Sequence, residues 1–159
     1  MPTVHDIIKE QDELAAHSPP ITMWPKKWKS YPNPRVLSWK LVRLVNASRN
    51  SVPFKSGIYS LLIRPDIAAH PSCSYLMYIG QTVDLRTRFG NYLTSERKET
   101  GRAKLFRLLN RYDEYLWFCF CEVPEADLDT VEDALIEAYV PHANGDFPAD
   151  MRPVVRAFR

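Results

Sequence analysis

Between residues 58 and 139 the spacing of apolar residues changes repeatedly from that of a strand to that of a helix. The order of these segments limits the folds that the chain can adopt. Residues 58–63 and 75–79 are short apolar segments, and the two prolines between them indicate a loop. Apolar residues at three- and four-residue steps predict helices over 83–93, 102–112 and 127–139. Residues 115–123 are apolar on both alternating sets, which indicates a strand buried on both sides. The order strand, strand, helix, helix, strand, helix predicts a small mixed α/β domain.

The N-terminal 55 residues have a different character. Residues 4–16 alternate acids with apolar residues and predict an amphipathic helix that ends before Pro19-Pro20. Residues 21–34 hold two tryptophans and three prolines, which favours an extended, turn-rich segment. The stripe formed by Leu37, Leu41 and Leu44 predicts a second helix after Pro34. We therefore expect a basic, helical and extended N-terminal arm (1–55), a domain over 56–145 and a basic tail (146–159).

Charge is unevenly distributed along the chain. The 159 residues are 45% apolar, enough for one core, and the net charge of +2 argues for no particular partner. Eight Lys or Arg and no acids lie between His17 and Lys55, whereas eleven acids and no Lys or Arg lie between Asp113 and Asp150. A molecule divided in this way can present one face to a polyanion.

The same composition predicts a soluble, cytoplasmic protein. Three cysteines cannot all pair internally, which suits a reducing compartment. The first residues are acidic and contain no apolar signal-peptide core. The longest purely apolar run, Tyr115 to Cys121, is too short for a bilayer, which needs about 20 residues. Cys119 and Cys121 share a strand face, and without a paired C-x-x-C motif core thiols are favoured over a zinc site.

Two mirror-image tripeptides mark the first two strands. Gly57-Ile58-Tyr59 lies on one, and Tyr78-Ile79-Gly80, followed by Gln81-Thr82, lies on the other. Arg88 follows in the next helix, Glu132 precedes Leu135-Ile136, and Pro141 precedes Asn144. Over roughly residues 56–145 this ordered set resembles the GIY-YIG nuclease family.

The helical pattern singles out Glu132 and Arg88 independently. Glu132 falls on the apolar stripe of residues 128, 131, 135 and 139, whereas Asp129, Asp133 and Glu137 point elsewhere. A carboxylate against a core must find a partner, which a divalent cation or an arginine would supply. Arg88 lies one turn before Tyr92, on the side that should meet the sheet.

The resemblance implies a central three-stranded antiparallel sheet flanked by helices, in an α+β domain, and a role for each site residue. Glu132 would hold one magnesium ion (Mg²⁺, with Mn²⁺ as a substitute), and Arg88 would neutralise charge on the phosphate. Tyr59 would deprotonate the attacking water, with Tyr92 as a second candidate base, while Tyr78 and Asn144 would orient the site. The structural alternative is that the tyrosines are core aromatics and that Arg88 pairs with Glu132.

Two basic segments are candidates for nucleic-acid binding. Trp24 and Trp28 interleave with Lys26, Lys27 and Lys29, so the segment either grips a nucleic acid or docks the arm through its tryptophans. Lys104, Arg107 and Arg111 form a basic stripe on their predicted helix, which suits a solvated face or a phosphate track.

The sequence thus predicts a metal-dependent endonuclease, stand-alone or of the restriction type, that acts on DNA and contacts no membrane. The alternative is a catalytically inactive nucleic-acid-binding module of the same fold. Strandedness, the choice between DNA and RNA, and the oligomeric state, including a homodimer, stay open.

Overall fold

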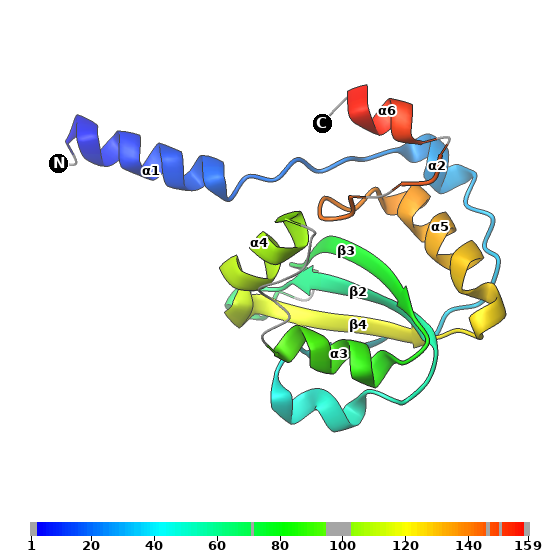
Figure 1. Cartoon of the computed structure of the whole chain (residues 1–159). Coiled ribbons are helices and arrows are strands. Elements are labelled where there is room, and N and C mark those ends of the chain that lie inside the picture. The colour runs from blue at the N-terminus through cyan, green and yellow to red at the C-terminus, as the bar shows by residue number, and fades with distance from the viewer. Residues whose placement is uncertain (1–2, 71, 95–102, 146, 150, 158–159) are drawn as a thin grey trace.

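The chain forms a four-stranded antiparallel sheet flanked by helices, described here from a computed structural model (Figure 1). The structure describes residues 3–70, 72–94, 103–145, 147–149 and 151–157. The strands lie in the order β1-β4-β2-β3, and every neighbouring pair is antiparallel. Their bounds are β1 Lys40–Arg43, β2 Gly57–Ile63, β3 Tyr75–Thr82 and β4 Leu116–Glu122.

Alternate residues of the strands feed two hydrophobic clusters. Tyr59 and Phe118 belong to the cluster that also holds the buried side chains of α3 (Leu85–Leu93) and α4 (Ala103–Arg111). Ile58 and Ile79 belong to the cluster built with α5 (Leu128–Tyr139) and with Val155 of α6 (Arg152–Ala157). Because side chains alternate across a strand, the two clusters cover the two faces of the sheet.

The predicted α+β class, the flanking helices and the helical N-terminal extension are confirmed, but the sheet has four strands rather than three. The extra strand is β1, which lies where the sequence predicted a helix. The stripe at residues 37, 41 and 44 fits a helix, yet β4 would otherwise be left with an unpaired edge. Pairing Leu41 with Cys119 and Val42 with Phe118 satisfies that backbone, so tertiary pairing overrides the local pattern.

The predicted N-terminal arm (1–55) contains two α-helices and also contributes strand β1 to the sheet. Helix α1 (Val4–Ala16) begins at a capping box between Thr3 and Asp6, has no buried residue and projects beyond the sheet (Figure 1). The connector, which we define as residues 17–24, runs from α1 to the short helix α2 (Pro25–Lys29), which packs beside α5. Helix α2 was not predicted within the turn-rich segment, and α6 was not predicted in the basic tail.

Short 3₁₀ turns join the main elements: η1 (Asn46–Ser51), η2 (Ile67–Ala69), η4 (Asp113–Tyr115) and η5 (Glu125–Asp127). No helix among the described residues is both long and apolar enough to span a bilayer.

Gly57 is required by close packing at the start of β2. A Cβ atom there would collide with the Cys121 carbonyl oxygen on β4 and lie 2.8 Å from Leu85 Cδ1 on α3. A Cβ atom at Gly145, by contrast, would meet no described atom within 4 Å, so this glycine offers a matched control.

We therefore expect Gly57→Ala to lower the free energy of unfolding by about 1–3 kcal/mol, the usual cost of overpacking. Gly145→Ala should change it by less than about 0.5 kcal/mol, as for other exposed substitutions. Urea unfolding of the two variants and the unsubstituted protein measures both values. Equal stabilities for the two variants would contradict this account of β2.

Candidate active site

Three tyrosines meet on the face of the sheet that α3 covers. Tyr59 on β2 and Tyr92 on α3 share a hydrogen bond with 2.8 Å between their hydroxyl oxygens. The Tyr59 ring lies 6.1 Å from the Tyr78 ring and stacks on Phe118 with a centroid distance of 5.2 Å. All three phenols are buried. The structure thus brings the tyrosines predicted from the sequence into one cluster.

Gly80 makes room for this cluster. It pairs with Tyr59 across β2 and β3, and a Cβ at Gly80 would lie 2.5 Å from the Tyr59 hydroxyl oxygen. A side chain there would therefore displace the phenol from Tyr92. The glycine of the second tripeptide is thus explained by the tyrosine of the first.

Burial governs the acidity of Tyr59. Desolvation raises its pKa well above the usual phenol value, with further contributions from Tyr92 and Tyr78, while the charge of Arg88 lowers it. The Arg88 Nε atom is itself buried, without a hydrogen-bond partner among the described residues. A buried guanidinium Nε donor beside the Tyr59 phenol is suited to an anion, because buried donors normally find an acceptor.

Glu132 is half-buried on α5 and is held by Gln81, the residue after the second tripeptide. The Gln81 Nε2 atom donates to Glu132 Oε2 at 2.8 Å and to Asp129 Oδ1 at 2.6 Å. Desolvation raises the pKa of Glu132, opposed by the Gln81 hydrogen bond and supported by the neighbouring charges of Asp133 and Asp129. Leu128, Val131 and Leu135 of the predicted stripe are buried, but Tyr139 is exposed. Asp129 is exposed, as expected for a residue off the stripe, yet its side chain reaches the same amide as Glu132.

Asn144 binds the backbone of the edge strand β3. Its Oδ1 atom accepts from the Ile79 N–H at 3.0 Å, and its Nδ2 atom donates to the Ile79 carbonyl at 2.9 Å. Ala143 donates its own N–H to the Met77 carbonyl at 2.8 Å. Val140, in a left-handed conformation with φ of 44°, ends α5 and turns the chain toward this edge. Asn144 therefore positions the strand segment between Tyr78 and Gly80.

The two predicted charges lie on different sides of β3. Glu132 contacts Gln81 on the α5 side, whereas Arg88 acts on Tyr59 on the α3 side. They form no ion pair in the described part of the chain, so the structural alternative of an Arg88–Glu132 pair is wrong. Consecutive residues Gly80 and Gln81 connect the two halves of the site.

The residues around Gln81 suit a magnesium ion. Magnesium binds in proteins through one or two carboxylates and completes its shell with water and substrate phosphates. Glu132 and Asp129 converge on one amide and supply such carboxylates. No cluster of three or more His, Cys, Asp or Glu side chains suited to a metal occurs among the described residues. Cys121 is buried, and burial raises the pKa of its thiol to about 12, as expected for a core thiol.

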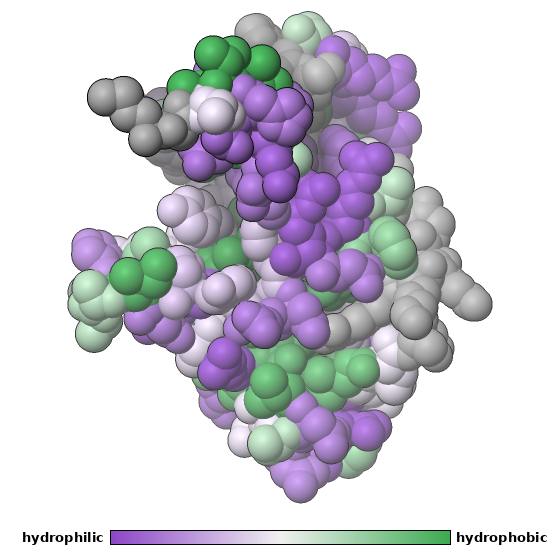
Figure 2. Space-filling model, turned by 90° about the vertical axis from the view of Figure 1, so that its left-hand side faces the viewer, coloured by the Kyte–Doolittle hydropathy of each residue, from purple (hydrophilic) through white to green (hydrophobic). Residues whose placement is uncertain are grey.

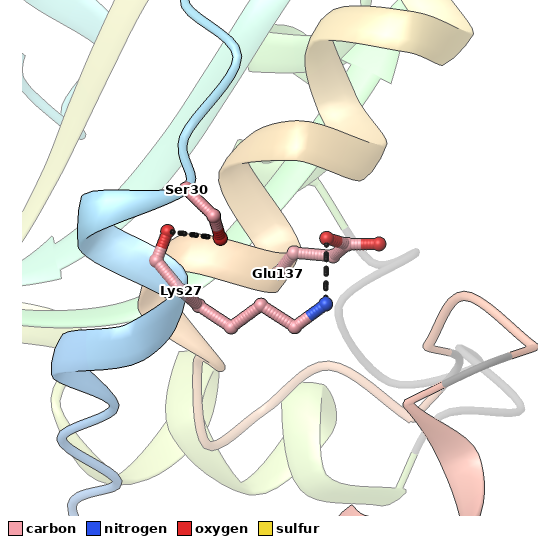
Figure 3. Close-up of polar contacts among 3 residues, drawn as sticks. All are labelled: Lys27, Ser30 and Glu137. Carbon is pink, nitrogen blue, oxygen red and sulfur yellow. Dashed lines mark hydrogen bonds and ion pairs between the residues drawn. The ribbon is translucent and has the colours of Figure 1, made fainter.

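The arm is docked onto α5 through part of its tryptophan–lysine segment. Lys27 Nζ lies 3.1 Å from Glu137 Oε2, and the Ser30 hydroxyl donates to the Lys27 carbonyl (Figure 3). The Trp28 Nε1 atom donates to the Ala138 carbonyl at 2.7 Å. Trp24 and Trp28 therefore dock the arm, as the docking alternative predicts, and Lys26 and Lys29 are exposed as it expects. Lys27 differs, because that alternative leaves the lysines in water and Lys27 pairs with Glu137.

The basic stripe of α4 lines a cleft. Lys104, Arg107 and Arg111 are exposed, and all three border a cavity of about 290 Å³ between α4 and the end of α1. Arg111 Nη1 donates to the Ala16 carbonyl and so also fastens α1 to α4.

Sequence reasoning missed Gln81 and Asp129 as members of the site. Gln81 directly follows Gly80, so its place beside the second tripeptide was visible in the sequence. Its partners were not, because nothing in the sequence states which rotamer brings an amide from β3 to α5.

No family model matches this chain, and no curated protein sequence matches it either. Among solved structures, a point mutant of the GIY-YIG N-terminal endonuclease domain of UvrC from Thermotoga maritima, bound to its catalytic divalent cation, aligns with 63% of this chain and 93% of its own. Its sequence identity is 22% and its TM-score 0.43. The magnesium-bound domain aligns with 62% of this chain and 92% of its own, at 22% identity and a TM-score of 0.41. The chain is similar to GIY-YIG endonuclease domains.

Asp84 fixes the start of α3, the helix that carries Arg88 and Tyr92. It accepts hydrogen bonds from the Thr87 backbone at 3.0 Å and the Thr87 hydroxyl at 2.7 Å. Desolvation acts to raise the pKa of Asp84, but the Thr87 bonds and the nearby Arg86 outweigh it and lower the pKa below 3.8. A lowered carboxyl pKa stabilises the fold above the unfolded-state value, and this contribution is lost as the pH falls through the folded-state value.

We expect Asp84→Ala to cost about 1 kcal/mol at pH 7, the usual loss of an N-cap. Because the contribution titrates, the difference from the unsubstituted protein should shrink as the pH falls from 6 to 3. Asp84→Asn keeps a capping oxygen without the charge, so its advantage over Asp84→Ala should not change with pH. Urea unfolding across this range checks both, and a constant difference for Asp84→Ala would contradict the assignment.

Proposed function

We propose that this protein is a GIY-YIG-type endonuclease that hydrolyses phosphodiester bonds of DNA and uses Mg²⁺, or Mn²⁺ in its place. The observation that carries the proposal is the unpaired, buried Nε donor of Arg88 beside Tyr59. Arg88 lies on the α3 side of strand β3. On the α5 side of the same strand, Gln81 holds the carboxylates of Glu132 and Asp129. A donor for phosphate and ligands for a cation are two of the requirements of phosphodiester cleavage, besides activation of the attacking water.

Glu132, supported by Asp129 through Gln81, would hold the metal. When bound, Mg²⁺ supplies positive charge to the phosphate oxygens and lowers the pKa of a coordinated water. Arg88 would bind a non-bridging oxygen and neutralise the charge that grows there. The Gln81 amide keeps Glu132 oriented before substrate arrives, so little rearrangement is needed.

The proton-transfer role is the most demanding part of the proposal. Because burial raises the pKa of Tyr59, little of the phenolate that could accept a proton is present at neutral pH, and Arg88 is the group that acts against this effect. Deprotonation of Tyr59 would therefore depend on Arg88, and Tyr92 shares the proton through the 2.8 Å hydrogen bond. The same raised pKa favours the second candidate function, a nucleic-acid-binding module that does not cleave.

The variant Glu132→Gln tests the metal-binding role of Glu132 while the fold of the protein is preserved. The substituted amide can still accept from Gln81 but binds a cation poorly, so we expect cleavage to fall at least about a hundredfold. The free energy of unfolding should not decrease at pH 7, because a desolvated charge is removed. Glu125→Gln, at an exposed position of η5 before α5, is the matched control and should cleave normally.

The assay follows nicking of supercoiled DNA and cleavage of single-stranded DNA with Mg²⁺ or Mn²⁺, and a chelator should stop both. Intact substrates under every condition, together with salt-dependent retention of DNA, would favour the binding module. Normal cleavage by Glu132→Gln would contradict the metal assignment.

Tyr59→Phe and Tyr92→Phe distinguish the two candidate bases. Both remove the shared hydrogen bond, so the loss of stability should be similar. General-base catalysis contributes about 10²- to 10⁴-fold, so the base is the residue whose substitution lowers kcat by that factor. We expect Tyr59→Phe to show the larger loss in single-turnover cleavage. Similar, less than tenfold losses in both would contradict a tyrosine base.

A further inference from the structure

The connector covers a cavity that the proposed chemistry does not use. This connector cavity has a volume of about 560 Å³ and lies between residues 17–23, the start of β3 and the loop after α5. Aromatic rings contribute much of its lining, including Tyr75 and Tyr139, which are 48% and 53% exposed overall. Its size falls within the range of small-molecule sites.

The connector cavity adjoins the cleft of the basic stripe. Both are lined by Met77, Tyr112 and His142, and Lys104, Arg107 and Arg111 belong to the cleft. Figure 2 looks onto the side of the molecule that carries α1 and α4, where hydrophilic side chains occupy much of the centre. Aromatic walls therefore adjoin a row of cations.

A third cavity lies beside the basic cleft and next to Asn144. It measures about 320 Å³ and shares Lys104 with the basic cleft. Arg152 and Arg156 of α6 line it together with Asn144, which binds the backbone of β3. Among the described residues no Asp or Glu lines any of the three cavities, although the chain carries 19 acids.

We propose that the connector cavity binds one unstacked nucleobase of the substrate strand, with the flanking phosphates on Lys104 and Arg107. The bases of a nucleic-acid strand stack on aromatic side chains, and its phosphates bind cations. The connector cavity supplies the aromatic side chains, and the adjoining basic cleft supplies the cations. The absence of carboxylates from the described lining residues matches a polyanion. This inference rests on the proposed function and adds that the substrate is single-stranded or has a displaced base near the cleavage point.

The test uses the full chain with chelator present, so that binding is measured without cleavage. The probes are a fluorescent single strand of about twelve thymidines, within the usual site size, and an abasic strand of the same length. Fluorescence anisotropy gives the affinity for each. The intact protein should bind the thymidine strand more tightly, because only that strand offers bases.

Substitution of the aromatic wall should affect one probe only. Tyr75→Ala and Tyr139→Ala should each weaken thymidine-strand binding about fivefold or more and leave abasic-strand binding unchanged. Tyr139→Phe retains the ring and should bind normally. Tyr115→Ala is the matched control, since Tyr115 is 44% exposed and lies outside the cavity.

Substitution of the stripe should affect both probes. Lys104→Ala and Arg107→Ala should each weaken both strands and reduce the slope of log K against log salt by about 0.7. Lys40→Ala, on the opposite edge strand β1, should not.

The inference would be overturned if the tyrosine variants bound the thymidine strand as tightly as the intact protein does. It would also be overturned if the intact protein bound neither strand. Glu132→Gln should lose cleavage yet keep this tyrosine dependence. If the tyrosine variants bind normally and the protein cleaves DNA, the base site is rejected and the proposed function stands. If binding depends on the tyrosines and DNA stays intact, only the cleavage activity is rejected.

Discussion

The outer edge of the sheet is held by the carboxamide of Asn144, which makes both hydrogen bonds of a backbone unit with Ile79. An edge strand otherwise presents unpaired N–H and C=O groups, which cost free energy where they are buried. A side chain fills this place without adding another strand. Tyr78 and Gln81, which flank Ile79 and Gly80, can then face functional groups on opposite sides of the sheet.

The candidate site depends on that fixed strand because its two halves are separated by it. Tyr78 and Gly80 bound the phenol cluster on the α3 side, and Gln81 reaches the carboxylates on the α5 side. A shift of β3 by one residue would exchange the faces and place Gln81 against the phenols. The pairing with Asn144 therefore fixes the register as well as the edge.

Long-range docking of the N-terminal arm creates the remaining surfaces. The Lys27–Glu137 ion pair and the Trp28 hydrogen bond attach α2 to α5, and the Arg111 contact with Ala16 attaches α1 to α4. Between these two attachments the connector crosses the β3 edge and encloses a cavity. The arm thus contributes walls to the connector cavity and to the basic cleft, in addition to its exposed lysines.

The sequence by itself determined the elements whose periods are strong and the residues that interrupt them. It identified the helices α3, α4 and α5 and singled out Tyr59, Tyr78 and Tyr92 as site residues. It also identified Glu132 as a carboxylate on an apolar stripe. Tertiary structure alone decided that residues 40–43 form β1, because the free edge of β4 outweighs a weak helical stripe. It also decided that Glu132 binds Gln81 rather than Arg88, and that Asp129 joins it. Periodicity assigns a residue to a face, whereas its partner depends on how two elements are set against each other in three dimensions.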